Sequence, residues 1–395
     1  MKFLAFHLMP YAEPDAMAAI ERSEPRRAWV TFSNTHFDPK RGSELYRRYL
    51  DELVHAVEVG FDGVGVNEHH QNAYGTMPSP NVMAAALTQR LDRGLIAVLG
   101  NALPLHRPQQ IAEQIAMLDL LSEGRIISGF VRGIGFEYLS FNVNPTESRE
   151  RFLEAHDLII RSWTEPGPFS WHGRFYDYDY VNVWPRPLQK PHPPVWIPSQ
   201  GSNETVQWVA ERGYSYLQTF TKRPRLAAIM REFREAARAA GHTATPEQQG
   251  WAVPTYVGES DEQARRELAP HVDVFFNKLL TGDVHNWFPP GYLSEESHAR
   301  VVSSKSDLFA HNAHTLERLE EDGMIVVGSA ETVTERFREI IDETGVGVVL
   351  PIVQMGSMPH EQTMASIERL GRRVLPKLRN HVSAVYREEA AAGPG

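Results

Sequence analysis

Cysteine is absent from the 395-residue chain. Its absence excludes disulfide bonds, thiolate-ligated zinc, iron–sulfur clusters and a cysteine nucleophile. No segment is rich in lysine and arginine, and the formal net charge is −10, so the sequence offers no cationic surface for nucleic acid or anionic lipid. No apolar run approaches the roughly 20 residues of a membrane span. We therefore expect partners other than nucleic acids and membranes.

The chain begins with a short apolar run, MKFLAFHLMPY, that Pro10 interrupts. No small-residue cleavage site follows, so the run is typical of a first strand and not of a signal peptide. Nor does the sequence have the cysteine framework of a small secreted fold. These observations favour a cytoplasmic protein.

Several common motifs are missing as well. The chain has no GxxxxGK[ST], HExxH or GxSxG motif, and GVGVNE and GIGFEY each lack the third glycine of a dinucleotide-binding fingerprint. A nicotinamide-binding Rossmann domain is therefore poorly supported.

Short apolar runs recur along the chain, and most are followed by a helical pattern. The eight runs are KFLAFHLM, FDGVGV, RGLIAVLG, GRIISGFV, PPVWIPS, YSYLQTF, WAVPTYV and VGVVLPIV. Strands covered on both faces have such continuous apolar character. We predict an α/β fold, a (β/α)8 TIM barrel formed as one domain by residues 1–382, with an open α/β sheet as the alternative. Residues 383–395 are predicted to be a disordered tail.

Helix boundaries are marked by capping residues. SELYRRYLDELVHAVEVG is predicted to begin at Ser43 and to end at Gly60. Two further helices are predicted to begin at Pro80, after the cap Ser79, and at Pro108.

Two stretches are longer than a connection between strand and helix requires, namely residues 10–42 and residues 258–323. In a barrel, extra chain between a strand and its helix lies over the C-terminal face, where active sites are found. We expect both insertions to be lids over that face, and ordinary surface insertions are the alternative.

One short pattern occurs twice, as GSNETV at 201–206 and GSAETV at 328–333. Each opens a helix and so offers free N–H groups and hydroxyl side chains to an anion. Plain helix caps are the alternative for both segments.

The segment Asn67-Glu68-His69-His70 follows the second apolar run. Adjacent residues of an extended chain point to opposite sides, so both imidazoles cannot face one metal ion, and we predict no metal site. One of the two histidines is expected to face the mouth of the barrel, where a pKa near 6.5 suits proton transfer. Two structural histidines are the alternative.

Other candidates follow the third and fourth runs. Leu99-Gly100-Asn101 offers small or flexible residues against which a planar ligand can lie, although the glycine can equally serve packing. Arg132 comes directly after the fourth run, where a charge is often a ligand contact. Arg149 and Arg151 open a helix, where a cation opposes the helix dipole unless an anion is bound.

In this order and spacing, the segments resemble those of the bacterial luciferase-like flavin monooxygenases. The resemblance rests on FDGVGVNEHH, AVLGNALPLHRPQQIAEQIAMLDLLSEGRIISGFVRG, SRERF, PPVWIPSQGSNETVQWVAERG and VVGSAETV. It implies a (β/α)8 barrel that binds FMN at its C-terminal face, usually as a homodimer. It also implies a non-proline cis peptide within residues 99–101.

The resemblance assigns roles to individual residues. It places His69 beside flavin and substrate as the catalytic residue, with His70 in support. The cofactor-binding residues that it implies are Glu68, Leu99, Gly100, Asn101, Val131 and Arg132 around the ring, and Arg149, Ser199, Gln200, Gly201, Ser202 and Thr205 around the phosphate.

The resemblance also implies the reaction. A separate NAD(P)H:flavin reductase would supply reduced FMN (FMNH2), and O2 as cosubstrate would form a flavin C4a-(hydro)peroxide that oxygenates a small, apolar or aromatic/carbonyl substrate. Trp287 and Phe288 in the second insertion favour an apolar substrate. Luciferase has a reactive cysteine at the position of Val131 and a Glu-Ser pair at Gln200-Gly201, which argues against light emission. The alternatives are a deazaflavin (F420)-dependent hydride-transfer oxidoreductase and a non-catalytic flavin-binding protein.

Overall fold

Parallel strands close into a barrel at the centre of the protein. The computed structural model describes residues 1–23, 27–299 and 312–392. In this part of the chain the main sheet has nine strands, and eight of them form a closed ring in the order β1, β2, β3, β4, β7, β8, β9, β11. Their bounds are β1 Lys2–Phe6, β2 Gly63–Val66, β3 Leu95–Ala102, β4 Ile126–Val131, β7 Val195–Ser199, β8 Ser215–Thr219, β9 Gln249–Val257 and β11 Val348–Ile352. The predicted (β/α)8 barrel is confirmed.

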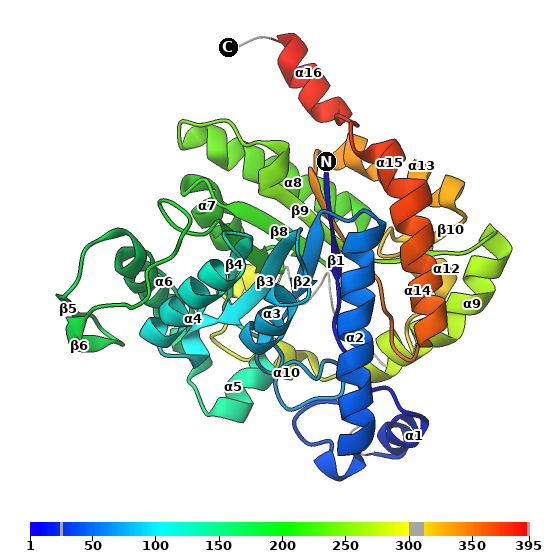
Figure 1. The fold of residues 1–395 in the computed structure, drawn as a ribbon, viewed down its shortest axis with the longest axis horizontal. Helices are drawn as coiled ribbons and strands as arrows, with labels where there is room; N and C mark the ends of the chain where they lie inside the picture. The colour runs from blue at the N-terminus through cyan, green and yellow to red at the C-terminus, as the bar shows by residue number, and fades with distance from the viewer. Residues whose placement is uncertain (24–26, 300–311, 393–395) are drawn as a thin grey trace.

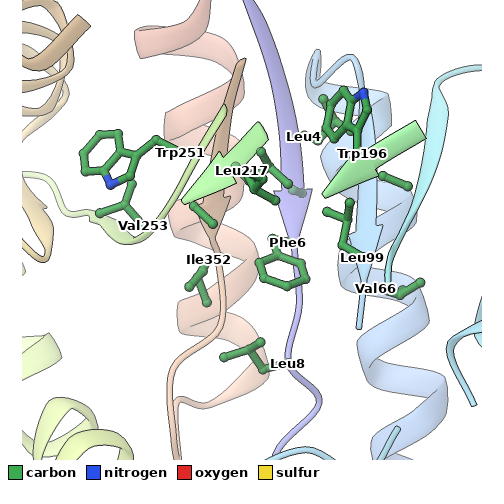
Figure 2. Packing of buried hydrophobic residues seen from close by; sticks show 14 of the residues in the cluster. Leu4, Phe6, Leu8, Val66, Leu99, Trp196, Leu217, Trp251, Val253 and Ile352 are labelled. Atoms are coloured by element: carbon green, nitrogen blue, oxygen red, sulfur yellow. The ribbon is translucent and has the colours of Figure 1, made fainter. Parts of the chain in front are cut away.

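The barrel interior is a packed apolar core. Gly65 of β2 faces it, and a Cβ at that position would lie 3.1 Å from Phe6, 3.2 Å from Leu99 and 3.6 Å from Leu350. Figure 2 shows Phe6 with Ile352 on one side and Leu99 on the other. The interior is therefore filled by side chains, which support the strand ends from below.

Helices surround the barrel (Figure 1). Those that follow the strands are α2 Pro39–Val59, α3 Pro80–Thr88, α4 Pro108–Leu121, α6 Ser148–Thr164, α7 Asn203–Glu211, α8 Arg223–Ala239, α13 Ala330–Thr344 and α14 His360–Arg369. The starts at Pro80 and Pro108 are as predicted. The predicted start of α2 at Ser43 is wrong, because Asp38 caps the helix by accepting a hydrogen bond from Lys40 N, and Pro39 is its first residue. None of the described helices combines the length and apolar character of a membrane span.

The two insertions contain helices of their own. The first holds α1 Pro14–Arg22, and the second holds α9 Asp261–Val274, a π-helix at Phe275–Leu279, α10 Val284–Trp287 and α12 Leu316–Glu321. Figure 1 shows α1, α10 and α5 (Gly135–Phe141) together at one end of the barrel, the end toward which β1 runs from the N-terminus. The parts of the two insertions around α1 and α10 thus lie at the C-terminal face, whereas α9 packs beside β9 and β10. Residues 300–311 lie outside the described part of the chain.

Two short strand features were not predicted. β5 (Phe169–His172) and β6 (Asp177–Val181) form an antiparallel hairpin away from the barrel (Figure 1), and β10 (Val326–Gly328) pairs with the end of β9. The hairpin strands are largely exposed and β10 is three residues long, so neither has the continuous apolar run by which the barrel strands are recognised.

The C-terminal segment is ordered further than predicted. After α15 (Leu375–Leu378), helix α16 (Ala384–Ala392) occupies most of the segment expected to be a disordered tail. Asp342 of α13 accepts a hydrogen bond from Ala384 N at 2.7 Å, and Tyr386 donates to the carbonyl of Ala244 at 3.0 Å. These contacts with α13 and with the segment between α8 and β9 explain the order. Residues 393–395 lie outside the described chain. The single domain over residues 1–382 stays a prediction.

A buried carboxylate joins the end of β1, helix α2 and the start of α14. Glu52 is fully buried and accepts hydrogen bonds from His7 Nε2 at 2.8 Å, Arg48 Nε at 2.7 Å and His360 Nδ1 at 2.8 Å. Burial alone would raise the pKa of Glu52, but the hydrogen bonds from both histidines and the charge of Arg48 lower it to about 2. The carboxylate is therefore charged at neutral pH.

Glu52→Gln leaves the guanidinium of Arg48 without its counter-charge. We expect the free energy of unfolding to fall by about 3–5 kcal/mol, as measured by urea denaturation. Since the folded pKa is about 2 against an ordinary value of 4.5, this stabilisation is present above pH 4.5 and lost as the pH falls toward 2. The Gln variant should lack that pH dependence.

The control for this prediction is Glu165→Gln, which breaks an exposed ion pair with Arg161. Such a pair contributes less than about 1 kcal/mol. Equal losses in the two variants would contradict the prediction.

Candidate functional site

A cavity of about 180 Å³ lies at the C-terminal ends of the barrel strands. Most of its wall is apolar, with contributions from Phe6 of β1, Leu217 of β8 and Ala252 of β9. The second insertion forms the opposite side of the cavity, through Leu280, Trp287, Phe288, Tyr292 and Leu293. This insertion therefore covers the cavity, as its predicted position requires.

Most of the predicted site residues meet in this wall. They are Glu68, His69, Leu99, Gly100, Val131, Arg132, Arg149, Ser199, Gln200, Ser202 and Thr205. His70, Asn101 and Gly201 are not part of it. The side chain of Asn101 turns away and accepts a hydrogen bond from Asn81 Nδ2 at 3.0 Å, because successive residues of β3 face opposite sides. Gly201 has a φ of +88°, and a Cβ there would point at Ile229.

Gly100 serves both the cavity and the packing of the sheet. A Cβ on Gly100 would lie 2.5 Å from the backbone of Gly129 on β4, so only glycine allows this approach of the two strands. The expected cis peptide is present between Leu99 and Gly100.

His69 forms a hydrogen-bonded pair with a carboxylate that was not predicted. Its Nδ1 lies 2.8 Å from Oε1 of Glu137, which is buried in the first turn of α5. The other oxygen of Glu137 accepts a hydrogen bond from Ile134 N at 2.7 Å. A carboxylate at Nδ1 keeps the proton on that nitrogen and leaves Nε2 as the basic atom of the ring.

An aromatic cluster fixes the position of His69 from behind. Trp29, fully buried in the first insertion, meets the His69 ring edge-on at 5.5 Å and stacks on Phe136 at 5.4 Å. Its indole N–H donates to the carbonyl of Leu279 in the second insertion at 2.9 Å. Trp29 therefore connects the first insertion to the second beside His69.

His70 bonds to a different carboxylate from His69. Glu68 Oε1 accepts from His70 Nε2 at 2.9 Å and from His106 Nε2 at 2.7 Å, while Oε2 accepts from Ala102 N at 3.2 Å. Burial alone would raise the pKa of Glu68, but the hydrogen bonds from His106 and His70 hold it below its ordinary value.

The ligand atoms of Glu68, His70 and His106 lie within 4.8 Å of one another, a composition known from metal sites. Here the carboxylate uses its oxygens to accept hydrogen bonds from the two rings and one backbone N–H. The two adjacent histidines therefore bond to different carboxylates, His69 to Glu137 and His70 to Glu68.

One end of the cavity is cationic. Arg149 is half-buried, and its guanidinium makes one long hydrogen bond of 3.4 Å to the carbonyl of Glu204. Arg132 packs over the ring of Tyr292 at 4.4 Å and donates to its carbonyl at 2.8 Å. Burial and the neighbouring charge of Arg132 lower the pKa of Arg149. Because the charge of Arg132 acts on Arg149, an anion bound between the two guanidinium groups would be stabilised.

The start of α7 lies at this cationic end. Ser202 and Thr205 line the cavity, and their hydroxyl oxygens are 2.8 Å apart. At the second GSxET segment, Asp261 accepts hydrogen bonds from Ser329 N at 2.6 Å and from the Thr332 hydroxyl at 2.9 Å. An internal carboxylate thus fills the start of α13, and the start of α7 is the one that faces the cavity.

The second insertion packs against α5 and the start of α7. A Cβ on Gly135 would collide with the carbonyl of Asn286, so the backbones of α5 and α10 are in contact. Ser294 and Ser297 donate to the two carboxylate oxygens of Glu204 on α7 at 2.6 and 2.8 Å. These contacts hold the insertion closed over the cavity.

Together these features define a class of protein: a (β/α)8-barrel enzyme with a covered apolar cavity, a histidine–carboxylate pair and an anion-binding end. Residues 28–347 match the sequence profile of the luciferase-like monooxygenases. The chain therefore belongs to this family.

Individual relatives agree with this assignment. The oxygenase component of the flavin-dependent trigonelline monooxygenase from Acinetobacter baylyi is 24% identical over 370 residues, which are 89% of this chain and 98% of that protein. The oxygenating constituent of 3,6-diketocamphane monooxygenase from Pseudomonas putida, solved with FMN, superposes with a TM-score of 0.72 at 18% identity, over 95% of this chain and 98% of its own. An F420-dependent secondary alcohol dehydrogenase superposes with a TM-score of 0.65 at 16% identity, over 96% and 100% of the two chains. The two solved structures share the fold with this chain.

The cationic end predicts that a flavin is held through its phosphate. Arg149→Ala removes a charge-assisted hydrogen bond, so we expect FMN binding to weaken by about 1.5–3 kcal/mol, roughly tenfold to a hundredfold. Riboflavin, which lacks the phosphate, should bind both proteins alike, and flavin fluorescence titration measures each affinity. Thr332→Val at the start of α13 is the control and should leave FMN affinity unchanged. The reverse pattern would move the phosphate site to α13.

Proposed function

We propose that this protein is the oxygenase component of a two-component monooxygenase. It takes FMNH2 from a separate NAD(P)H:flavin reductase and uses O2 to oxygenate a small, apolar or aromatic/carbonyl substrate. The observation that carries this proposal is the His69–Glu137 pair in the wall of a covered, largely apolar cavity. When bound, reduced FMN supplies the electrons that activate O2.

The residues around the cavity fit FMN. Arg149, Ser202 and Thr205 would hold the phosphate, since they join a cation to the hydroxyl groups at the start of α7. Leu99, Gly100 and Val131 form an uncharged part of the cavity wall, and the flavin ring would lie against it. Arg132, Ser199 and Gln200 also line the cavity.

Three functions fall to the chain itself. His69 Nε2 accepts or returns a proton at the reacting ligand, and Glu137 keeps the ring in the required tautomer. Glu68 fixes His70 by a hydrogen bond, outside the lining of the cavity. The second insertion, through Trp287 and its neighbours, excludes water from the cavity.

A separate reductase is supported by two observations. The relative from Acinetobacter baylyi is named as an oxygenase component, and this chain has no dinucleotide-binding fingerprint of its own. We place both components in the cytoplasm, where NAD(P)H is available.

We also propose a homodimer. Four apolar side chains of α3 and α4 are exposed, namely Val82, Met117, Leu120 and Leu121. A second copy of the chain would cover them and remove this apolar surface from water. Sedimentation velocity tests this, and a monomer at every concentration would contradict it.

A deazaflavin-dependent hydride transfer is the second candidate, because the F420-dependent dehydrogenase shares the fold. Rapid mixing of the protein and FMNH2 with O2 separates the candidates. For an oxygenase we expect the return of oxidised-flavin absorbance to be delayed relative to free FMNH2. Tight binding of F420 with weak binding of FMN would support the deazaflavin enzyme. Binding of FMN with no delay and no turnover would indicate a non-catalytic flavin-binding protein.

His69→Ala should retain FMN affinity, because the proposed phosphate contacts lie elsewhere, yet lose turnover by about 10²- to 10⁴-fold. His70→Ala should cost less turnover and more stability, since His70 is bonded behind the wall. Product formation, with any substrate that the wild type oxygenates, and thermal unfolding measure both effects. Near-normal turnover in folded His69→Ala protein would mean that the imidazole serves the fold alone.

A further inference from the structure

Two side-chain oxygens of cavity-lining residues have no hydrogen-bond partner among the residues that the structure describes, and the indole nitrogen of Trp208, which also lines the cavity, has none either. The two oxygens are Oδ1 of Asn67 and Oγ1 of Thr219, and both atoms are buried. Both residues line the cavity, and Asn67 is only 6% exposed. A buried polar atom without a partner is costly, so native proteins retain one mainly where a ligand or water completes it.

These two residues lie on opposite sides of the barrel mouth. Asn67 directly follows β2, and Thr219 ends β8. Three strands separate β2 from β8 in either direction around the closed ring of eight. The wall between them is apolar at Phe6, Leu217 and Ala252. A ligand in this part of the cavity thus meets one polar atom on each side and apolar surface between them.

The charges around the cavity disfavour an anionic substrate. Among the described lining residues, the only arginine or lysine side chains are Arg132 and Arg149, at the end proposed for the phosphate. The carboxylates of Glu68 and Glu137 line the same cavity, and that of Glu68 has a lowered pKa. An anionic substrate would be repelled by these carboxylates, and the cations are committed to the cofactor.

We propose that Asn67 and Thr219 determine specificity, and that the substrate is an uncharged, largely apolar molecule with an O–H or N–H group on two sides. Asn67 Oδ1 accepts a hydrogen bond from one such group, and the Thr219 hydroxyl exchanges a hydrogen bond with the other. This inference deepens the proposed function and rests on it. The ring N–H of a flavin is the other source of a donor, and the experiment separates the two sources.

The experiment compares two probes of equal shape, p-xylylene glycol and p-diethylbenzene, which differ only in hydroxyl against methyl groups. Their binding to the FMN-saturated protein is followed by quenching of tryptophan fluorescence, since Trp287 lines the cavity. We expect the wild type to prefer the glycol by about tenfold or more, because only the glycol satisfies the buried oxygens. Terephthalate, the dianionic analogue, should bind more weakly than either probe.

Asn67→Leu and Thr219→Val should each reduce the preference for the glycol about fivefold to tenfold and leave p-diethylbenzene affinity within about twofold. Thr219→Ser keeps the hydroxyl and should keep the preference. Ser128→Ala is the matched control, because Ser128 Oγ is also buried without a described partner but lies on β4 outside the cavity wall. It should change neither affinity.

Equal affinity of the wild type for the two probes would overturn the proposal, as would an unchanged preference in both Asn67→Leu and Thr219→Val. A loss of FMN affinity in Asn67→Leu with the preference unchanged would assign Asn67 to the cofactor and overturn its role toward the substrate. If wild-type protein fails to delay FMNH2 oxidation but keeps the preference, the oxygenase proposal fails and the assignment of these two residues stands.

Discussion

Buried carboxylates hold the mouth of this barrel together. Glu52 of α2, Glu68 after β2 and Glu137 of α5 are each less than 5% exposed, and each accepts hydrogen bonds from one or more imidazoles. A charge in such a place is tolerated only when its partners surround it, so each carboxylate fixes the segments that carry those partners. The segments in question are the strand ends and loops that form the cavity. Stability and the geometry of the site therefore depend on the same three groups.

The fold was predictable to the extent that burial leaves a mark on the sequence. Strands of a parallel barrel are covered on both faces, and runs such as VGVVLPIV therefore stand out. The β5–β6 hairpin has no continuous apolar run, because most residues of its strands are exposed to solvent or only partly buried. Helix α16 was missed for another reason, since its alanine-rich segment is ordered by contacts with Asp342 and Ala244 that are distant in sequence.

The site was predictable where position along a strand determines position in space. The carboxyl ends of parallel strands share one face, so His69, Leu99 and Arg132 were expected near one another, and all three line the cavity. Their partners follow no such rule. Glu137 lies 68 residues from His69, and nothing in GIGFEY distinguishes it from an ordinary helix-capping glutamate. The two GSxET segments are likewise alike in sequence, and only the structure shows that Asp261, distant from both in the chain, occupies the second one while the first lines the cavity.

The contact of Gly135 with Asn286 sets the height of the covering insertion above the strand ends, because no side chain separates the two backbones. The distance between the covering insertion and the barrel is thus fixed by α5 and α10, whereas the polar atoms of Asn67 and Thr219 belong to the strand ends at the barrel mouth. A larger residue at position 135 would push the insertion away from the barrel without changing the strand ends. A substitution at Asn67 or Thr219 would leave that distance unchanged. The length of an accepted molecule and its polarity are therefore set by separate parts of the chain, and each can drift in evolution while the other is kept.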